Sequence, residues 1–431
     1  MHYKAQRGTH DIFCEFAEKM NLIDQKFRDI FKKHGFEEIK TPIFEDARLF
    51  THSIGYATDI IEKEMYIFND KKGRKLALRP EGTSSLVRAF IEHKMDISGS
   101  IYKFFYSGEM FRYERPQSGR YRQFHQIGAE LFGVSSPAAD AEIILLVYDL
   151  LNSIGINEIV VHINSLGCKK CRPILNRKLI KYLTSISNLC ENCTKRLDIN
   201  PFRVLDCKED FNKFVGIPKI SDYLCYECKH DFDILQSLLS IDCKYNFVVD
   251  DKLVRGLNYY TKTVFEICYK NICSLKNKDF ILAAGGRYDN LVEELGGKNT
   301  PAVGFALGSE RVLIAVKENK NLLFFDNFRK FEKIYIAITD QELFKEAFSF
   351  ATGITKNKLN NNEYINKNIS VFGPISNKNL TEQLKIANKI HVNKTIIFAK
   401  KEFKNGKILM RDMKNKTQIE IGISKLINKL I

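Results

Sequence analysis

The sequence lacks the long apolar segments of membrane and secreted proteins. Across its 431 residues, no uncharged apolar run approaches the roughly 18 residues that a membrane span needs. Residues 1–10 contain no apolar core of the signal-peptide kind, so we expect a cytoplasmic protein. Hydrophobic residues make up 44% and charged residues 28% of the chain, a balance that excludes wholesale disorder, collagen and coiled-coil arrays.

Two motifs of common enzyme classes are also missing. The sequence has no Gly-x-x-x-x-Gly-Lys-Ser/Thr loop, which excludes a P-loop nucleotide site. It has no Gly-x-Ser-x-Gly segment, so a serine nucleophile of that type is excluded as well.

Positive charge is concentrated toward the C-terminal end. The chain carries 67 Lys and Arg against 52 Asp and Glu, a net charge of +15. Residues 331–431 hold 18 Lys and Arg and 9 Asp and Glu, so about a quarter of the chain carries more than half of the surplus. A basic module indicates a polyanionic partner, nucleic acid before membrane. A coding bias toward lysine is the alternative explanation.

Hydrophobic spacing predicts the first elements of the chain. Apolar residues recur at helical spacing over 17–34, and Gly35 follows as a C-cap. Residues 36–45 resemble a strand, and Pro42 within it indicates an edge or an interface because proline has no N–H to donate. Alternating aromatic and polar residues over 101–132, interrupted by a Pro/Gly loop, predict an antiparallel hairpin.

Further elements surround a cysteine-rich interruption at about 165–245. We expect a helix over 138–151, strands over 245–250, 263–268 and 304–308, and a helix that opens at Ser309. After a linker at 318–329, a strand over 333–339, a helix over 380–389 and a strand over 395–399 predict a small α/β domain.

Arginine and glutamate recur together in the strand-like segments. Guanidinium groups bind phosphates in bidentate fashion and stay charged when partly buried, so the set favours a phosphate or carboxylate site over isolated ion pairs. Carboxylates beside them suit a substrate that also carries an amine or an imidazole. The arginines are Arg79, Arg112, Arg120, Arg122, Arg255, Arg287 and Arg311, and the carboxylates are Glu81, Glu114 and Glu130.

Six segments in a fixed order resemble one enzyme family. They are Arg-Pro-Glu-Gly-Thr at 79–83, Phe-Arg-Tyr-Glu at 111–114, and the segments 119–126, 253–260, 284–289 and 304–311. The set resembles the histidine–tRNA ligases, which are class II aminoacyl-tRNA synthetases. The segment with Pro42 is similar to class II motif 1, residues 111–126 to motif 2, and residues 304–311 to motif 3. Residues 253–260 and 284–289 are similar to the two histidine-specific signatures.

The resemblance implies an α+β fold. It implies a class II catalytic domain over residues 1–325, with a mostly antiparallel sheet of six or seven strands and a Cys-rich insertion at about 165–245. It also implies a C-terminal α/β anticodon-binding domain over residues 331–431. The segment with Pro42 would lie at the two-fold interface of a homodimer.

The same resemblance implies a two-step reaction and a role for each site residue. Histidine attacks ATP, bound with Mg²⁺, to give histidyl-adenylate and pyrophosphate, and the histidyl group then moves to histidine tRNA. Arg112 and Arg255 would be catalytic. Histidine would contact Glu81, Gly82, Thr83, Arg112, Gln126, Glu130, Arg255, Tyr259 and Tyr260. ATP would contact Arg112, Glu114, Arg120, Arg122, Phe124 and Arg311, and the tRNA acceptor stem would contact Arg115 and Gln117.

Two other readings are compatible with parts of this pattern. A synthetase-like regulatory subunit of the histidine-biosynthesis phosphoribosyltransferase resembles the catalytic core but lacks an anticodon-binding domain. A non-enzymatic RNA-binding module is the second. The basic C-terminal unit and the intact arginines favour the enzyme. One departure from the family is Asn258, where aspartate is frequent, and we expect it to support the local strand rather than bind substrate.

Six of the eleven cysteines form three C-x-x-C pairs. In a reducing cytosol such pairs indicate metal or redox chemistry rather than disulfides. The candidate zinc ligands are Cys168, Cys171, Cys190, Cys193, Cys225 and Cys228, with Cys207 between the second and third pairs. Zinc needs four converging ligands, and three pairs allow several sets of four. Free thiols are the alternative, and the surrounding pattern is unlike that of thioredoxins.

Overall fold

The computed structural model divides the chain into two compact units, Met1–Phe325 and Asp326–Ile431. It describes residues 3–55, 58–97, 99–207, 209–241, 245–270, 280–318, 331–356, 369–374 and 378–430. For residues 427–430 it describes the backbone alone. The linker expected at 318–329 lies outside the described residues except for Glu318.

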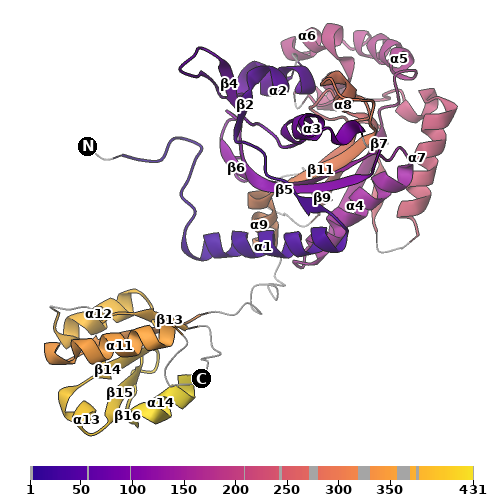
Figure 1. Ribbon diagram of the computed structural model, residues 1–431. Helices are drawn as coiled ribbons and strands as arrows, with labels where there is room; N and C mark the ends of the chain where they lie inside the picture. The colour runs from indigo at the N-terminus through magenta and orange to yellow at the C-terminus, as the bar shows by residue number, and fades with distance from the viewer. Residues whose placement is uncertain are drawn as a thin grey trace. The chain divides into compact units, whose positions relative to one another are not determined.

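An eight-stranded sheet organises the first unit (Figure 1). Its six central strands are antiparallel, as expected, and the short strand at each edge runs parallel to its neighbour. These two edge strands make the sheet wider than the six or seven strands predicted. In spatial order the strands are β1 (Glu37–Glu38), β5 (Tyr102–Phe111), β6 (Gln123–Phe132), β11 (Ala302–Gly308), β10 (Phe280–Arg287), β9 (Thr261–Tyr269), β7 (Ile159–Ser165) and β8 (Phe247–Val249).

The predicted hairpin and the first helix are confirmed. Strands β5 and β6 pair without interruption from Tyr102 opposite Phe132 to Phe111 opposite Gln123. Helix α1 (Cys14–Lys33) turns one apolar stripe toward the sheet. Gly35 follows it with φ = +78°, the left-handed conformation that glycine adopts most readily after a helix.

The single strand predicted over 36–45 is wrong, because the chain forms two short strands there. Strand β1 pairs with β5, whereas β2 (Phe44–Asp46) joins a separate three-stranded sheet with β4 (Lys75–Leu78) and β3 (Ile67–Asn69). Pro42 lies between the two strands and has no N–H for either ladder. The side chain of Arg79 holds this connection by donating to the Thr41 carbonyl at 2.9 Å.

Helices cover both faces of the eight-stranded sheet (Figure 1). Alternate side chains of β5 point to opposite faces, with Phe105 in one core and Phe104 in the other. The first core includes α1, α4 (Pro137–Asn152), α7 (Tyr226–Leu239) and α9 (Ser309–Glu318). The second includes α3 (Thr83–Glu92) and α8 (Leu291–Glu294).

The Cys-rich insertion is built from helices and single turns. Within its described residues it contains α5 (Arg172–Thr184), α6 (Glu191–Ile199), the 3-10 turns η3 (Pro201–Val204), η4 (Phe211–Lys213) and η5 (Ile220–Tyr223), and α7. The remaining short elements of the first unit are α2 (Ala47–Ile54), the π-helical turn η1 (Ile60–Glu64) and the 3-10 turn η2 (Met95–Ile97). No helix in the described part of the chain combines the length and apolarity that crossing a membrane requires.

The second unit is an α/β domain, as predicted. Its five-stranded sheet has a parallel part, β13 (Ile369–Phe372), β12 (Glu332–Ile338) and β14 (Lys394–Phe398), and an antiparallel part, β15 (Lys407–Asp412) and β16 (Gln418–Gly422). Helix α11 (Phe344–Thr355) packs on one core and α12 (Leu380–Lys389) on another. A capping box of Asn379 and Glu382 begins α12. The unit also contains η6 (Gln341–Leu343), α13 (Lys400–Lys404) and α14 (Ile423–Leu430).

A buried ion pair links β10 to α4, and its removal should destabilise the first unit strongly. Arg287 and Asp140 are each 1% exposed, and Arg287 Nη2 lies 2.5 Å from Asp140 Oδ2. We expect Arg287→Met to lower the free energy of unfolding by about 3–5 kcal/mol, because Asp140 is left as an unpaired buried charge. Denaturant unfolding followed by circular dichroism measures this loss.

Arg48→Met is the matched control. Arg48 pairs with Asp46 at 2.6 Å, but its side chain is 80% exposed, so its loss should change the free energy of unfolding by less than about 1 kcal/mol. Equal losses in the two variants would contradict the stabilising role of the buried pair.

Candidate active site

A pocket of about 360 Å³ opens over the eight-stranded sheet, where β6, β11, β10 and β9 are consecutive neighbours in the sheet. Small residues of the strands, among them Ala284, Gly304 and Ala306, form part of its lining. The predicted site residues that line it are Glu81, Thr83, Arg112, Glu114, Arg120, Phe124, Gln126, Glu130, Arg255, Tyr259, Tyr260 and Arg311. Residues from four distant parts of the sequence therefore converge on one cavity.

The carboxylate of Glu130 is buried beneath this pocket, with 1% of the residue exposed. Thr83 Oγ1 donates to Glu130 Oε1 at 2.7 Å, and Tyr288 Oη donates to Oε2 at 2.6 Å. Burial raises the pKa of Glu130 to about 8, even though these two hydrogen bonds favour the charged form. A bound N–H donor or cation would therefore stabilise the Glu130 carboxylate.

Gly304 makes room for this carboxylate. A Cβ atom at position 304 would overlap Glu130 Oε2, so no other residue fits on β11 opposite Glu130 without displacing it. The glycine in the motif 3 segment is thus explained by the close approach of a site residue.

Glu81 and Gln126 are held in place by neighbouring backbone. The Glu81 carboxylate accepts hydrogen bonds from the Thr83 and Ser84 N–H groups at 2.7 and 2.8 Å, at the start of α3. Gln126 Oε1 accepts a bond from the Gly82 N–H at 3.2 Å. Gly82 thereby helps to orient the Gln126 side chain through its backbone N–H.

Two aromatic residues complete this part of the pocket. Tyr259 and Tyr260 are 4% and 6% exposed, and their rings lie 4.7 Å apart. Burial raises the pKa of Tyr260 to about 12, so its hydroxyl is protonated and can donate at neutral pH. Phenol and carboxylate groups here can satisfy both the donors and the acceptors of a small polar ligand.

Arginines dominate another part of the lining. Arg255 contacts the carboxylate of Glu266 through Nη1, and Arg311 lies with its guanidinium carbon 4.4 Å from the centre of the Phe280 ring. The Nε atoms of both arginines are buried without a hydrogen-bond partner among the described residues. Burial and the nearby Arg120 lower the pKa of Arg311 to about 10. An anion in the pocket would accept hydrogen bonds from these Nε groups and offset the repulsion between Arg311 and Arg120.

Arg112, Arg120 and Glu114 form a loose charged group beside them. Glu114 lies 3.8 Å from Arg112 Nη1 and 3.6 Å from Arg120 Nη1, and Arg112 Nε donates to the Pro80 carbonyl at 2.8 Å. The Arg112 guanidinium carbon also lies 5.5 Å from the centre of the Phe124 ring. Long ion pairs of this kind leave the guanidinium groups free to bind phosphate.

Some predicted residues lie outside the pocket lining. Arg122 stacks on the Tyr113 ring, with its guanidinium carbon 3.6 Å from the ring centre, and its backbone N–H donates to the Gly8 carbonyl. Arg115 and Gln117 are exposed on the loop between β5 and β6. Among the arginines singled out at first, Arg79 and Arg287 are structural, because their donors bind protein carbonyls and carboxylates.

Several acidic or phenolic residues of the pocket lining were not predicted, among them Glu266, Tyr288 and Asp206. Glu266 contacts Arg255, Tyr288 binds Glu130, and Asp206 extends from the insertion. Tyr288 could have been found, because it lies in the segment 284–289 that carries a family signature. Asp206 could not, because no spacing pattern in the sequence connects the insertion to the pocket.

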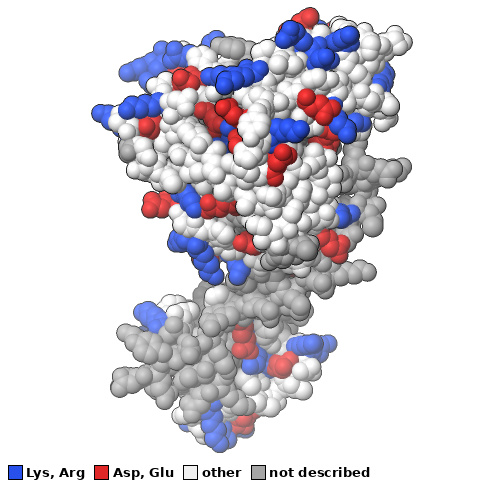
Figure 2. All heavy atoms as spheres, turned by 90° about the vertical axis from the view of Figure 1, so that its right-hand side faces the viewer, with Lys and Arg blue, Asp and Glu red and all other residues white. Residues whose placement is uncertain are grey.

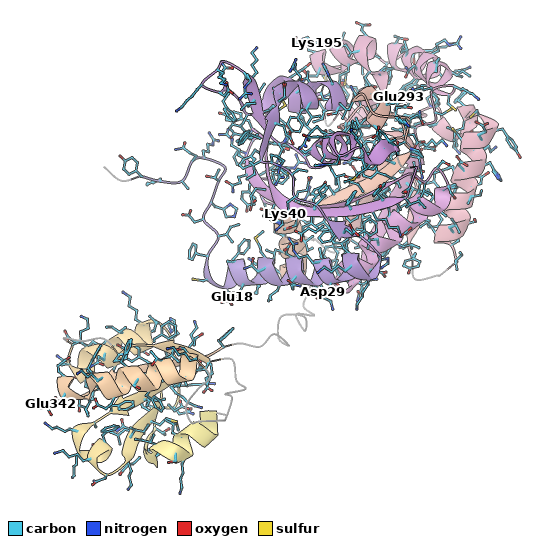
Figure 3. All side chains as sticks on the ribbon, viewed as in Figure 1. Glu18, Asp29, Lys40, Lys195, Glu293 and Glu342 are labelled. Carbon is cyan, nitrogen blue, oxygen red and sulfur yellow. The ribbon has the colours of Figure 1, made fainter. Side chains whose placement is uncertain are left out.

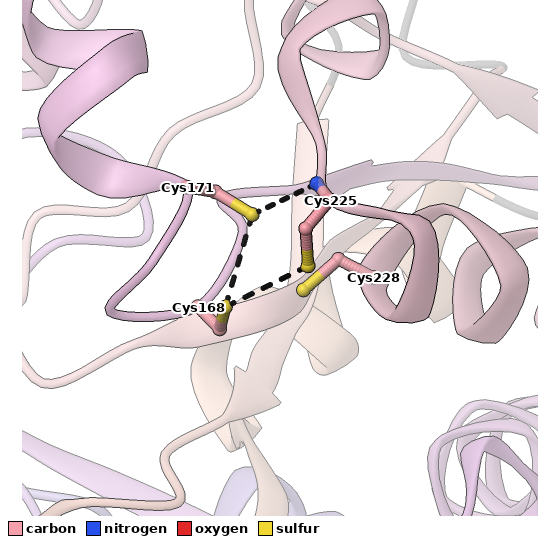
Figure 4. Close-up of side chains that lie close together, drawn as sticks. All are labelled: Cys168, Cys171, Cys225 and Cys228. Carbon is pink, nitrogen blue, oxygen red and sulfur yellow. Dashed lines mark hydrogen bonds between the residues drawn. The ribbon is translucent and has the colours of Figure 1, made fainter.

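The three C-x-x-C pairs separate into two clusters. The first and third pairs converge to form cluster A, which is Cys168, Cys171, Cys225 and Cys228 (Figure 4). The Sγ atom of Cys168 lies 3.8 Å from that of Cys171 and 3.9 Å from that of Cys225. The Cys225 N–H donates to the Cys171 sulfur at 3.1 Å.

The second pair belongs to a separate group, cluster B, which is Cys190, Cys193, Cys207 and Asp210. The Sγ atoms of Cys190 and Cys207 lie 3.7 Å apart, and backbone N–H groups donate to both sulfurs at 3.4 Å. Asp210 was not among the candidate ligands. Its position three residues after Cys207 repeats the C-x-x-C spacing and is the pattern that could have identified it.

Both clusters have the dimensions of a tetrahedral metal site. Sulfurs bound at about 2.3 Å to a tetrahedral zinc lie roughly 3.8 Å apart, which matches the observed separations. The four ligand atoms of each cluster lie within 4.8 Å of one another. Disulfide bonds, with sulfurs about 2.05 Å apart, do not account for this arrangement.

Two protein families match the two units of the chain. The family described as histidyl-tRNA synthetase matches residues 8–170 and 220–312, and the family described as anticodon binding domain matches residues 333–431. The gap between the two stretches of the first match spans residues 171–219, within the insertion.

Individual relatives cover the whole chain. It is 63% identical over 425 residues to the histidine–tRNA ligase of Endomicrobium trichonymphae, covering 99% of this chain and 100% of that protein. It is similar to the crystal structure of apo S. aureus histidyl-tRNA synthetase, with a TM-score of 0.78, 30% identity and full coverage of both chains. A structure described as an ATP phosphoribosyltransferase regulatory subunit/histidyl-tRNA synthetase from Bacillus halodurans C matches with a TM-score of 0.61 and covers 93% of this chain and 99% of that one. At 18% identity, that match shows the fold alone.

The raised pKa of Glu130 predicts a pH-dependent stability in the absence of ligands. Below the ordinary glutamate range the group is protonated in both folded and unfolded states. As pH rises toward about 8, only the folded state must hold the proton, so stability falls. We expect Glu130→Gln to gain in melting temperature relative to the unsubstituted protein between pH 5.5 and 8.5, as measured by scanning fluorimetry.

Glu18→Gln is the control for this experiment, because Glu18 is exposed on α1 and lies at the periphery of the first unit (Figure 3). Its melting temperature should follow that of the unsubstituted protein at every pH. A constant difference between Glu130→Gln and the unsubstituted protein would contradict the buried, protonated carboxyl group.

Proposed function

Because the chain belongs to the histidyl-tRNA synthetase family, we propose that the pocket over β6, β11, β10 and β9 binds L-histidine and ATP and forms histidyl-adenylate. ATP-dependent ligation of L-histidine to histidine tRNA is the activity of the chain. The observation that carries the assignment to this pocket is the union of a buried carboxylate, Glu130, with two arginines, Arg255 and Arg311, whose Nε donors are buried without a partner among the described residues. A zwitterionic amino acid and a triphosphate need these two environments side by side. We place the reaction in the cytoplasm, where translation uses the charged tRNA.

The carboxylate part of the pocket suits the histidine substrate. We assign its α-amino group to Glu81, Thr83 and Gln126, with Gly82 fixing Gln126 through its backbone. We assign the imidazole to Glu130, Tyr259 and Tyr260, whose burial makes an unmatched ligand unfavourable. Arg112 and Arg255 would hold the substrate carboxylate near the α-phosphate of ATP.

The arginine part suits the triphosphate. In the first step a carboxylate oxygen of histidine forms a bond to the α-phosphorus, and the bond to the bridging oxygen breaks to release pyrophosphate. Arg112 and Arg255 stabilise the charge that develops on the α-phosphate, so catalysis is positioning and electrostatics. Arg120, Arg122 and Arg311 would hold the outer phosphates and the nucleotide, Phe124 would stack on adenine, and Glu114 would contact the nucleotide. Mg²⁺ enters with ATP as its counter-ion.

In the second step a hydroxyl of the 3′-terminal adenosine of the tRNA attacks the histidyl carbonyl. AMP leaves, and a phosphate oxygen of the adenylate can accept the hydroxyl proton, so no side chain is needed as a base. Arg115 and Gln117 are exposed on the motif 2 loop and would contact the acceptor stem. The domain over 331–431 would bind the anticodon stem and loop.

The tRNA contacts of the second unit would be local clusters of basic residues. Acidic and basic side chains are interspersed over the described surface shown in Figure 2, in both units. On α13, Lys401 and Lys404 are exposed, whereas Lys400 pairs with Glu342 at 2.7 Å.

We also propose a homodimer that uses the three-stranded sheet. Four large apolar residues of this sheet and its entry are exposed in the single chain: Ile43, Phe44, Ile67 and Phe68 are 44%, 54%, 52% and 42% exposed. The Phe44 and Phe68 rings lie 6.4 Å apart, so the residues are adjacent. Adjacent exposed apolar side chains beside Pro42 support an interface at this sheet.

For the metal clusters we propose Zn²⁺. Thiolate and carboxylate ligands in tetrahedral array suit zinc better than magnesium or calcium, which prefer oxygen ligands and larger coordination numbers. When bound, the ion would crosslink segments of the insertion, and neither cluster takes part in the chemical steps above.

Pyrophosphate exchange into ATP, measured with each of the twenty amino acids, tests the proposed reaction. We expect Arg255→Ala to slow histidine-dependent exchange about a hundredfold or more, since a charge aimed at the transition state is worth roughly 3 kcal/mol. Histidine binding, measured by calorimetry, should change far less. The control is Arg177→Ala, an exposed position on α5. Wild-type single-turnover adenylation by Arg255→Ala would overturn the assigned role.

Removal of the second unit should separate tRNA charging from adenylation. A chain ending at Phe325 should lose tRNA charging far more than pyrophosphate exchange, because only charging uses the macromolecular substrate. Charging by the full chain should fall steeply with salt, as phosphate contacts release counter-ions, whereas exchange should respond weakly. Both proteins are first shown to be dimers by sedimentation. Equal losses in the two assays from an intact dimer would mean that this unit does not bind tRNA.

A further inference from the structure

Cluster B is joined through the chain to the proposed histidine pocket. One of its ligands, Cys207, follows Asp206, which lines the pocket. All four ligands lie within residues 171–219, the stretch that separates the two matches to the histidyl-tRNA synthetase family. The ligands come from the start of α6 and from the turn after η3, so a metal ion there would tie these two segments together.

The environment of cluster B fits a buried ion. Cys193 and Asp210 have no exposed surface, and Cys207 is 7% exposed. Both oxygens of Asp210 have hydrogen-bond donors, the Cys190 N–H at 2.8 Å and Lys213 Nζ at 2.7 Å. Each carboxylate oxygen has a second lone pair for a metal. Donors that orient a ligand in this way are typical of the outer shell of a metal site.

The segment that cluster B closes also holds the loop that carries Arg255, Tyr259 and Tyr260. Arg203, which is 3% exposed, donates to the Gly256 carbonyl, and its Nη2 lies 3.0 Å from Asp59 Oδ2. Asn200 Nδ2 donates to Asn258 Oδ1 at 2.8 Å. Asn258 was expected to support the local strand, but it lies in the turn before β9 and its side chain contacts the insertion instead.

Cluster A holds the other end of the same loop. Arg172 follows Cys171 directly, and its Nη2 donates to the Tyr260 carbonyl at 2.5 Å. The Lys262 N–H donates to the carbonyl of Gly167, next to Cys168, at 3.0 Å. Each cluster is therefore one residue away from a group that contacts the histidine pocket or its loop.

We propose that the insertion binds two zinc ions, one in each cluster, and that together they clamp residues 255–260 in the conformation that binds histidine. The zinc in cluster B positions Asp206 and the Gly256 carbonyl, and the zinc in cluster A positions the backbone of Tyr260. The role in histidine binding rests on the proposed function of the pocket, whereas the two metal sites do not.

Metal analysis of the full chain, purified without a polyhistidine tag, tests the sites. We expect two zinc ions per chain by inductively coupled plasma mass spectrometry. Cys190→Ser/Cys193→Ser and Cys225→Ser/Cys228→Ser should each retain one. The control Cys14→Ser, at an exposed cysteine outside both clusters, should retain two. A chain that holds no zinc as purified and binds none on equilibrium dialysis against Zn²⁺ overturns the proposal.

A matched pair at one ligand tests the clamp. Asp210→Ala should lose the zinc of cluster B, raise the KM for histidine about tenfold with a smaller change for ATP, and speed hydrogen exchange at residues 255–258. Asp210→Cys creates a four-cysteine site, so it should retain two zinc ions, a near-normal KM for histidine and slow hydrogen exchange at residues 255–258. Loss of zinc without a change in hydrogen exchange or in the KM for histidine would overturn the clamp.

The two kinds of failure are distinguishable. If the unsubstituted protein holds two zinc ions but shows no histidine-dependent pyrophosphate exchange, the proposed function fails and the metal sites stand. If histidine-dependent pyrophosphate exchange is normal and zinc is absent, the clamp fails and the proposed function stands.

Discussion

Close packing against the strands around Glu130 is the constraint on which the site depends. Gly286 of β10 and Gly304 of β11 must be small, because the Tyr260 ring and the Glu130 carboxylate occupy the space above them. A Cβ atom at Gly304 would overlap Glu130, and one at Gly286 would lie 2.9 Å from the Tyr260 ring. The opposite faces of the same strands bury Leu282 and Phe305 in the core. One face of these strands therefore packs large side chains into the core, whereas small residues on the other face leave room for Glu130, Tyr260 and the substrate.

The polar groups of the pocket balance one another only when ligands are bound. Burial leaves Glu130 with a raised pKa and leaves Arg311 with a lowered one, so each charged group is less stable than it would be in water. A cationic or N–H-bearing group against Glu130 and an anion against the arginines reverse both penalties. Buried charged groups held in place for a ligand make the pocket selective, but they lower the stability of the unliganded protein.

Local sequence patterns predicted the elements whose form depends on local periodicity. The helix at 17–34, the hairpin at 101–132 and the helix at 380–389 are present with nearly the expected bounds. The strand at 36–45 failed because β1 and β2 join different sheets, a tertiary choice that apolar spacing does not encode. Arginines divided in the same way. Arg255 and Arg287 occur in similar segments, but only the fold puts a protein carboxylate and carbonyls around every donor group of Arg287.

The division of the cysteines shows the same limit more sharply. Spacing identifies each C-x-x-C pair, because two ligands three residues apart can share one ion, but which pairs meet is decided by the fold. The first and third pairs, 57 residues apart, share cluster A, and the second pair takes Cys207 and Asp210 instead. The fourth ligand of cluster B is an aspartate, which sequence reasoning restricted to cysteine could not include.

The need for crosslinks follows from how the insertion is built. Its turns η3, η4 and η5 are three or four residues long, too short to be stable as isolated helices. Apolar packing fixes part of this segment, with Phe202 and Val204 in the core shared with α3. Arg203 and Asp206 point away from that packing toward Gly256 and the pocket, so their positions depend on how firmly the turn between them is held. Cluster B lies immediately after that turn, where a metal ion restrains the backbone without adding bulk to the substrate site.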